Sequence, residues 1–188
     1  ADAVGRVTEQ GGMAATANPY DLAINGRGFF QITLPSGQTA YTRAGNMAVN
    51  ADGALVTADG YPVEPSVTVP QEATAIQVTR DGIVEVTIAG QTTPQQIGQL
   101  EIASFINPAG LEAIGDNLFL ETPASGTANT ATPGSPGLGT LMQGYLELSN
   151  VNAVEEISAL IVAQRAYEMN ARVITAADEM LQSTTQLR

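Results

Sequence analysis

Histidine, cysteine, tryptophan and lysine are all absent from this 188-residue sequence. Without histidine and cysteine the chain can form no disulfide, offers no His or Cys metal ligand and has no Cys–His or Ser–His–Asp nucleophile system. Aromatic residues make up only 5% of the chain. No apolar run approaches the roughly 18 residues of a membrane-spanning helix. These absences exclude most common catalytic centres and predict no insertion into a membrane.

Positive charge is also scarce, because seven arginines stand against 19 acidic residues and give a net charge of −12. A nucleic-acid backbone or an anionic membrane would repel such a chain, so we expect no nucleic-acid partner. The sequence opens with Ala1 and shows no signal-peptide pattern, and we expect that it was trimmed at its N-terminus. Its length suffices for one or two domains with a real core.

The fold class predicted from the pattern is mainly β. Short runs rich in Val, Ile, Thr and Phe alternate with turn signals between residues 21 and 121. Pairs of runs flank Pro35-Ser36-Gly37, Ala51-Asp52-Gly53 and Arg80-Asp81-Gly82, which predicts antiparallel hairpins. We expect the core to close within about residues 18–122, so that a chain ending at Gly139 still folds.

The rest of the chain divides by composition. Residues 1–20 are small and polar and predict an extended lead-in. Residues 122–140 carry no charge, three prolines and four glycines, and we interpret them as a linker or as a surface loop on its neighbours. Residues 141–188 form a C-terminal segment. Apolar residues recur every 2 positions in the β region but about every 3.6 positions in this segment. It predicts one long, coiled-coil-like α-helix over about 153–186, with Asn152 as N-cap and Glu155 completing a capping box.

Two apolar seams with the 3,4 spacing of a coiled coil lie side by side on this helix. Two seams indicate two helical neighbours, supplied by a missing segment or by other subunits. A helix lying on its own β-domain is the alternative, and would need only one seam. The Leu160 seam consists of Leu160, Ala163, Tyr167, Asn170, Ile174, Ala177 and Leu181, and the Val162 seam of Val162, Ala166, Met169, Val173, Ala176 and Met180.

Candidate ligand sites are incomplete wherever the sequence suggests one. Gly26-Arg27-Gly28 lacks the third glycine and the following helix of a dinucleotide loop, so we predict that Gly26 and Gly28 permit a bend between strands. The Asp-Gly pairs at Asp52, Asp59 and Asp81 lack calcium-loop spacing and are read as turns. We expect no metal and no cofactor.

Paired carboxylates, which could indicate a glycosidase, have simpler explanations. Glu155-Glu156 and Asp178-Glu179 lie in the predicted helix, where capping and solvation account for them. No pattern directs the acidic residues of the β region at one another; these are Asp21, Glu64, Glu101 and Glu121. We therefore expect a protein that is not an enzyme.

Two long motifs resemble a known family. The stretch NPYDLAINGRGFFQI, residues 18–32, resembles the entry motif of the bacterial flagellar axial proteins, which build rod and hook. The stretch QGYLELSNVNAVEEI, residues 143–157, followed by AQRAYEMN, residues 163–170, resembles that family's C-terminal signature. Within the family, residues 98–126 are most similar to distal-rod subunits. The absence of a large insertion between residues 21 and 126 argues against the hook.

The resemblance implies a structural subunit of the basal-body distal rod. Such subunits are exported by the flagellar type III apparatus without a cleaved signal peptide and stack helically into a tube across the periplasm. Their terminal helices pair and line the tube, and a β-domain forms an outer layer. The resemblance also implies an N-terminal helix that is missing from this sequence, and partners that are copies of the chain and other rod and hook proteins. Another rod or hook protein is one alternative. A non-catalytic, acidic β-domain that displays residues 122–140 to a partner is the other.

Overall fold

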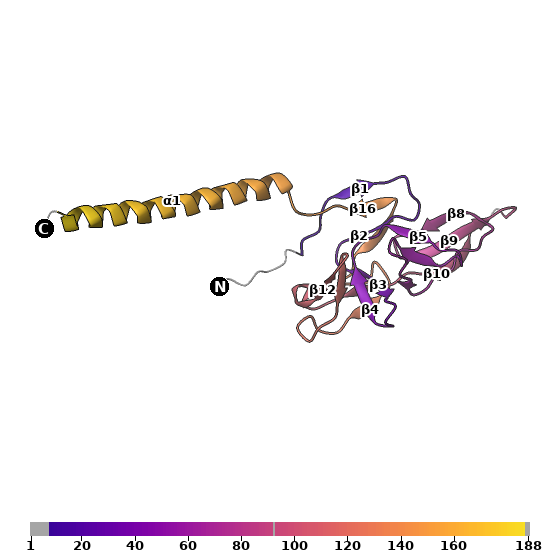
Figure 1. The fold of residues 1–188 in the computed structure, drawn as a ribbon. Helices are drawn as coiled ribbons and strands as arrows, with labels where there is room; N and C mark the ends of the chain where they lie inside the picture. The colour runs from indigo at the N-terminus through magenta and orange to yellow at the C-terminus, as the bar shows by residue number, and fades with distance from the viewer. Residues whose placement is uncertain (1–7, 92, 187–188) are drawn as a thin grey trace. The chain divides into compact units, whose positions relative to one another are not determined.

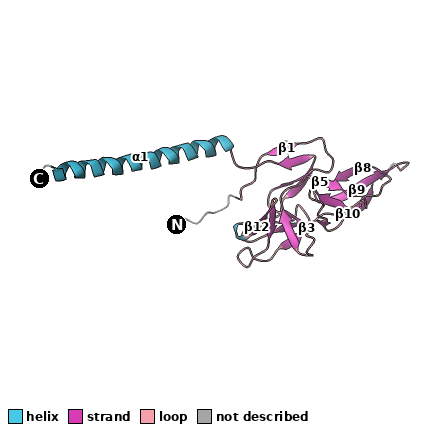
Figure 2. Ribbon diagram, viewed as in Figure 1, coloured by secondary structure: helices cyan, strands magenta, loops and turns pink. Residues whose placement is uncertain are grey.

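The computed structural model describes residues 8–91 and 93–186. The chain divides into two compact units, a β unit that ends at Leu148 and a helical unit that begins at Ser149. Antiparallel strands make up the first unit and one long helix the second, as Figures 1 and 2 show. The predicted fold class, a hairpin-rich β-domain followed by a long helix, is confirmed.

The three predicted hairpins are all present. β3 (Phe29–Thr33) pairs with β4 (Thr39–Thr42), and β5 (Met47–Val49) pairs with β6 (Leu55–Thr57). β8 (Ala73–Val78) pairs with β9 (Ile83–Ile88), and β10 (Gln95–Gln99) extends that pair to three strands. Each hairpin follows the local alternation of apolar residues and turn signals, which is why the sequence alone predicts it.

The largest sheet has seven strands, and β3 and β4 lie at its centre. Its order is β12-β13-β4-β3-β11-β14, with β7 also pairing to β3. A short 3₁₀ turn, η1 (Pro108–Gly110), follows β11. The remaining strands of this sheet are β7 (Val63–Glu64), β11 (Ile102–Ser104), β12 (Glu112–Gly115), β13 (Leu118–Leu120) and β14 (Asn129–Ala131).

Two further strand pairs join segments from opposite ends of the sequence. β1 (Met13–Ala15) pairs with β16 (Tyr145–Glu147), and β2 (Leu22–Asn25) pairs with β15 (Thr140–Gln143). The β unit therefore includes parts of the expected lead-in and of the C-terminal segment. It also includes β14, inside the charge-free segment 122–140. The β1–β16 and β2–β15 pairings join residues more than 100 positions apart, which local patterns do not encode.

Adjacent phenylalanines supply two separate cores on opposite faces of β3. Phe30 is fully buried in the main cluster with Leu22, Ile24 and Ile102. Phe29 belongs to a second cluster, which includes three edge-to-face ring contacts: Phe29–Phe105 at 5.8 Å, Phe29–Phe119 at 5.9 Å and Tyr41–Phe105 at 4.8 Å between ring centroids. A β-strand points successive side chains to opposite faces, so one Phe-Phe pair contributes to both cores.

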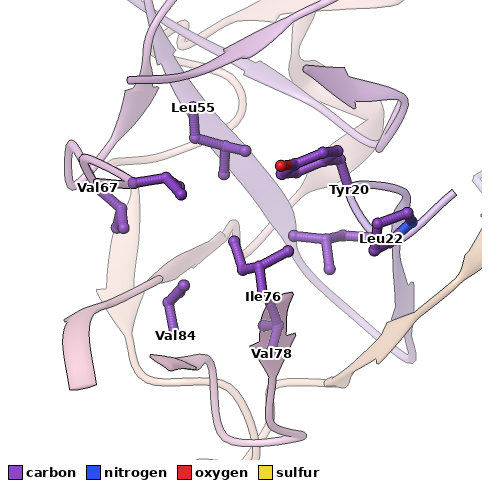
Figure 3. Close-up of a pocket in the computed structure, with 9 residues that line it drawn as sticks. Tyr20, Leu22, Leu55, Val67, Ile76, Val78 and Val84 are labelled. Atoms are coloured by element: carbon purple, nitrogen blue, oxygen red, sulfur yellow. The ribbon is translucent and has the colours of Figure 1, made fainter. Parts of the chain in front are cut away.

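A small gap beside the main cluster is lined by apolar side chains that point toward one another (Figure 3). Its volume is about 10 Å³, room for roughly one water molecule. It is a packing gap rather than a ligand pocket. Its walls are Pro19, Tyr20, Leu22, Leu55, Val67, Val69, Ile76, Val78 and Val84.

Helix α1 (Ala153–Gln186) matches the predicted range and contains no proline or glycine. Asn152 caps it, because its side-chain Oδ1 accepts a 3.1 Å hydrogen bond from the backbone N–H of Val154, and the predicted N-cap is confirmed. Glu155 and Glu156 lie in the first turn, at the positive end of the helix dipole. Among the described residues, no helix combines the length and the apolar character needed to cross a membrane.

Candidate assembly site

In the helical unit by itself, the described apolar side chains of both seams are exposed. Tyr167 is 80% exposed and Ile174 is 64% exposed, and Leu160 in the same seam is also exposed. A lone helix has no interior in which to bury such side chains, so their stabilisation requires another surface. The side chains of two seam residues, Ala177 and Leu181, lie outside the described part of the chain.

The chemistry of this helix face is that of a packing surface. The Leu160 seam places small Ala163 and polar Asn170 between large residues, and the Val162 seam adds exposed Val162, Ala166, Met169 and Val173. Alternating large and small residues allow helices to approach closely. The assignment of both seams as subunit interfaces stays a prediction.

The bend between β2 and β3 depends on its two glycines. Gly26 and Gly28 have φ of 114° and 145°, in the region that disfavours other residues. A Cβ at Gly26 would lie 2.9 Å from Cα of Gly139, and one at Gly28 would lie 2.9 Å from Cδ1 of Ile102. The backbone therefore both turns and comes close to its neighbours at this bend, and no phosphate-binding helix follows it.

Arg43 holds this bend against the last strand of the β unit. Its Nη1 donates to the carbonyl oxygens of Gly26 at 3.0 Å and Gly28 at 2.9 Å, and its Nη2 donates to that of Ile24 at 3.2 Å. Its Nε and Nη2 reach Oε2 of Glu147 at 2.8 Å and 2.7 Å. These five contacts equal the five N–H donors of a guanidinium, and both side chains are largely buried.

The same carboxylate also binds the N-terminal side of the β unit. Oε1 of Glu147 accepts a 3.0 Å hydrogen bond from the backbone N–H of Gly11. Gln10 donates to the carbonyl of Ile24 at 3.1 Å and accepts from the N–H of Gly26 at 3.0 Å. Leu148 N–H donates to the carbonyl of Gly12 at 2.7 Å. The segment that leads to the helix thus leaves the β unit beside residues 10–12, fixed by the Arg43–Glu147 pair.

Three of the carboxylates considered as catalytic candidates have separate structural partners. Glu64 accepts from the Thr33 hydroxyl at 2.9 Å, Glu121 accepts from the Ala128 N–H at 2.9 Å, and Asp21 accepts from the Asn18 amide at 2.8 Å. Asp52, Asp59 and Asp81 lie in turns. Within the described ranges no three acidic side chains gather as a metal-ligand group.

One side chain in the aromatic core has a shifted protonation equilibrium. Burial raises the pKa of the Tyr41 phenol above its ordinary value of 10.0, and the nearby negative charge of Glu121 raises this pKa further. Tyr41 therefore stays neutral and packs as an aromatic ring at physiological pH.

Sequence reasoning missed the Arg43–Glu147 pair and its backbone acceptors. The pair spans 104 residues, and no motif connects the two positions. The only available signal was the scarcity of basic residues, since Arg27, Arg43 and Arg80 are the three between residues 8 and 148.

Comparison with known families gives matches to both units. Residues 23–86 match the family described as the flagellar hook protein FlgE/F/G D1 domain. Residues 142–187 match the family described as the flagellar basal body rod FlgEFG protein C-terminal region. The first match covers the β3–β4 and β5–β6 hairpins and most of the β8–β9 hairpin, and the second covers helix α1 and the preceding strand β16.

The individual relatives are also flagellar rod and hook proteins. A flagellar basal-body rod protein FlgG of Caulobacter vibrioides is 59% identical over 188 residues, which covers 100% of this chain and 72% of the relative. The FlgG of Bacillus subtilis is 42% identical over 179 residues, which covers 93% of this chain and 67% of the relative. A flagellar hook protein FlgE of Borreliella burgdorferi is 36% identical over 112 residues, 60% of this chain and 25% of that protein.

Proposed function

This chain belongs to the FlgG family of flagellar basal-body rod proteins and is a structural rod subunit; we propose that it polymerises helically through its terminal helices to build the distal part of the rod. The observation that carries the proposal is the pair of apolar seams on α1, whose described side chains are exposed on the isolated helix. The rod FlgG relatives cover the chain more completely than the hook relative does, which favours rod over hook.

The physical argument starts from the cost of an isolated helix. A single helix in water is held mainly by the packing of its apolar face, because propensity alone is marginal. The 34 residues of α1 span about 50 Å at about 1.5 Å per residue. The apolar side chains of both seams are buried when helices from two neighbouring subunits pack against α1. Polymerisation thus gives the helix the partners that its sequence pattern requires.

The proposal includes partners and location. The partners are copies of this chain and the adjacent rod and hook proteins, and the location is the part of the basal body that crosses the periplasm, reached by export without a cleaved signal peptide. The role is mechanical and non-catalytic. This role is supported by the family and by three candidate carboxylates, Asp21, Glu64 and Glu121, which are held by separate structural hydrogen bonds.

The decisive experiment changes one seam residue without touching the β unit. Ile174→Asp places a charge in the Leu160 seam and should raise the concentration needed for self-association at least tenfold, since burying an unpaired charge is unfavourable. Gln164→Asp adds the same charge outside both seams, also on an exposed helix position, and should change association less than twofold. Sedimentation velocity measures association, and thermal unfolding of the same samples measures the stability of the β unit.

The two measurements distinguish a helix that packs on neighbouring copies from a helix that packs on its own β unit. Weaker association with an unchanged β-unit melting temperature supports the polymer interface, because distant sites act independently. A large fall in that melting temperature without any change in association would instead mean that the helix packs on its own β unit.

A further inference from the structure

Asn25-Gly26 is the one Asn-Gly dipeptide in the sequence, and it lies at the end of β2, where the bend to β3 begins. Asparagine before glycine is chemically reactive in proteins, because glycine has no side chain to obstruct its own backbone nitrogen. That nitrogen can attack Cγ of the preceding side chain. Asn25 is exposed, so water reaches its amide group. The bend that Arg43 holds therefore contains a site at which the chain can modify itself.

The reaction is deamidation through a cyclic imide. The Gly26 nitrogen loses its proton and forms a bond to Cγ of Asn25, while the Cγ–Nδ2 bond breaks and Nδ2 leaves with the proton as ammonia. Water then opens the imide ring. Attack of water at Cγ gives aspartate, and attack at the backbone carbonyl carbon gives isoaspartate, in which the main chain runs through the former side chain. The only co-reactant is water.

Gln10 holds the hydrogen of the attacking nitrogen. Its Oε1 accepts a 3.0 Å hydrogen bond from the Gly26 N–H, and its Nε2 donates to the Ile24 carbonyl at 3.1 Å. The Gly26 N–H must lose this bond before the nitrogen can attack, and the bond also resists the rotation of the peptide group that brings nitrogen and Cγ together. Pairing of Asn25 with Thr140 keeps the strand extended at the same point. Gln10 therefore opposes the first step of the reaction.

The three Asp-Gly pairs of the β unit provide an internal comparison, since aspartate before glycine forms the same imide with loss of water. In each pair the glycine N–H donates to a carbonyl three residues earlier, within its own turn. At Gly26 the acceptor is instead a side chain 16 residues earlier in the sequence. Protection of Asn25 therefore depends on tertiary structure, whereas that of the Asp-Gly pairs needs only a local turn. The local bonds run from Gly53 to Asn50 at 3.0 Å, from Gly60 to Thr57 at 2.9 Å and from Gly82 to Thr79 at 3.0 Å.

Long-range contacts keep Gln10 in place. The Gly11 N–H donates to Oε1 of Glu147 at 3.0 Å, and the Leu148 N–H donates to the Gly12 carbonyl at 2.7 Å. β1 then pairs with β16. The acceptor for the Gly26 N–H is thus in position only while residues 10–12 are attached to the last strand of the β unit. Local opening of such segments is what exposes protected amides in native proteins.

We propose that Asn25 is a deamidation site whose rate is set by Gln10, so that its modification records how long residues 10–12 have been detached from the β unit. The inference goes beyond the proposed function and applies to a single copy of the chain, whether or not copies associate.

The isoaspartate product should disturb the fold. It adds a methylene group to the backbone at a place where even a Cβ on Gly26 would lie 2.9 Å from Cα of Gly139. The Gly26 carbonyl also accepts a hydrogen bond from Arg43, which the longer backbone would displace. The isoaspartate form, isolated after incubation, should therefore have a lower β-unit melting temperature than the unmodified chain.

The test follows deamidation of the full chain during incubation in mildly alkaline buffer. Mass spectrometry of the peptide that contains Asn25 detects the exchange of ammonia for water, and separation of its isoaspartate and aspartate forms identifies the imide route. Gln10→Leu removes the acceptor and should raise the rate about fivefold, because one hydrogen bond makes a modest net contribution. Gln10→Glu keeps an acceptor oxygen and should stay within about twofold of the wild type, since a carboxylate also accepts from an N–H.

A synthetic peptide of residues 20–30 gives the rate without the fold and should deamidate about tenfold faster than the folded chain, or more. Melting curves check that the variants are folded, as expected for a change at exposed Gln10. Gln10→Ala, which also lacks the acceptor, replaces the leucine variant if that one does not fold.

Three results would overturn the inference. Deamidation of the folded wild type at the peptide's rate would show that the structure gives Asn25 no protection. A wild-type rate in the variant without the acceptor would show that Gln10 does not control the reaction. Equal acceleration in Gln10→Leu and Gln10→Glu would assign the effect to loosening of residues 10–12 rather than to the acceptor oxygen.

Discussion

The two units of this chain handle their apolar residues in opposite ways. The β unit buries Leu22, Ile24 and Phe30 almost completely between strands drawn from both ends of its sequence. Helix α1, described by itself, leaves residues such as Tyr167 and Ile174 exposed. The first pattern gives a unit that can close its own core, and the second gives a surface that needs another helix. The two units therefore differ in whether the unit itself covers its apolar side chains, and the association of the helix stays a prediction.

The largest effect should come from removing the strands that close the β unit. A chain ending at Leu148 should unfold cooperatively, at nearly the same temperature as the β unit of the full protein. A chain ending at Gly139 loses β15 and β16, including Leu141, which is 1% exposed. Losing one such side chain costs about 2–5 kcal/mol, against a total stability of about 5–15 kcal/mol.

Thermal unfolding followed by circular dichroism, and the spread of chemical shifts in NMR spectra, show which of the two truncated chains is folded. The shorter chain should be mostly unfolded, in contrast to the expectation from local patterns that residues of about 18–122 suffice. If both chains melt alike, β15 and β16 add nothing to the core and the boundary at Leu148 loses its physical meaning.

The next effect concerns the pair that fixes the end of the β unit. Arg43→Met removes the hydrogen bonds that Arg43 donates to Glu147 Oε2 and to three backbone carbonyls, which should lower the free energy of unfolding by about 2–3 kcal/mol. Arg80→Met removes an exposed arginine and should cost less than about 0.5 kcal/mol. Urea unfolding of both variants gives the two values, and equal values would show that Arg43 acts only as a surface charge.

A smaller change should affect the helix alone. Asn152→Ala removes the side-chain oxygen that accepts from Val154 N–H, a loss of about 1 kcal/mol of helix stability. Helical ellipticity of the dissociated chain should fall while the β-unit melting temperature stays constant. Gln164→Ala, in the middle of the helix, serves as control and should not reduce helicity. A drop in the β-unit melting temperature would mean that the cap supports more than the helix.

The smallest effect appears only in alkaline solution. Because the folded pKa of Tyr41 is raised above its ordinary value of 10.0, the folded state holds this proton more tightly than the unfolded state. The resulting stability is fully present below about pH 10 and is lost as the pH rises through the folded pKa. Tyr41→Phe should flatten this part of the stability–pH curve and leave the curve near pH 7 almost unchanged. An identical alkaline decline in both proteins would assign it to other groups.

Local patterns predicted the hairpins and the helix because their determinants are close in sequence. The runs on either side of Pro35-Ser36-Gly37 and Arg80-Asp81-Gly82 need only alternation and a turn to pair. The helix needs only a 3.6-residue period and a cap at Asn152. The same patterns gave the two seams, which are a property of spacing along one element. Their role as interfaces is a prediction that Ile174→Asp addresses.

The sequence by itself thus determined the mainly β character, the start and length of α1 and the absence of histidine and cysteine chemistry. Only the tertiary structure decided where the β unit ends, how Arg43 reaches Glu147, and that β14 pairs with β11. Those features join residues that lie far apart in the sequence, and each depends on the whole β unit being closed. Local propensity acts over a few residues, whereas closure of a core selects pairings among all of them at once.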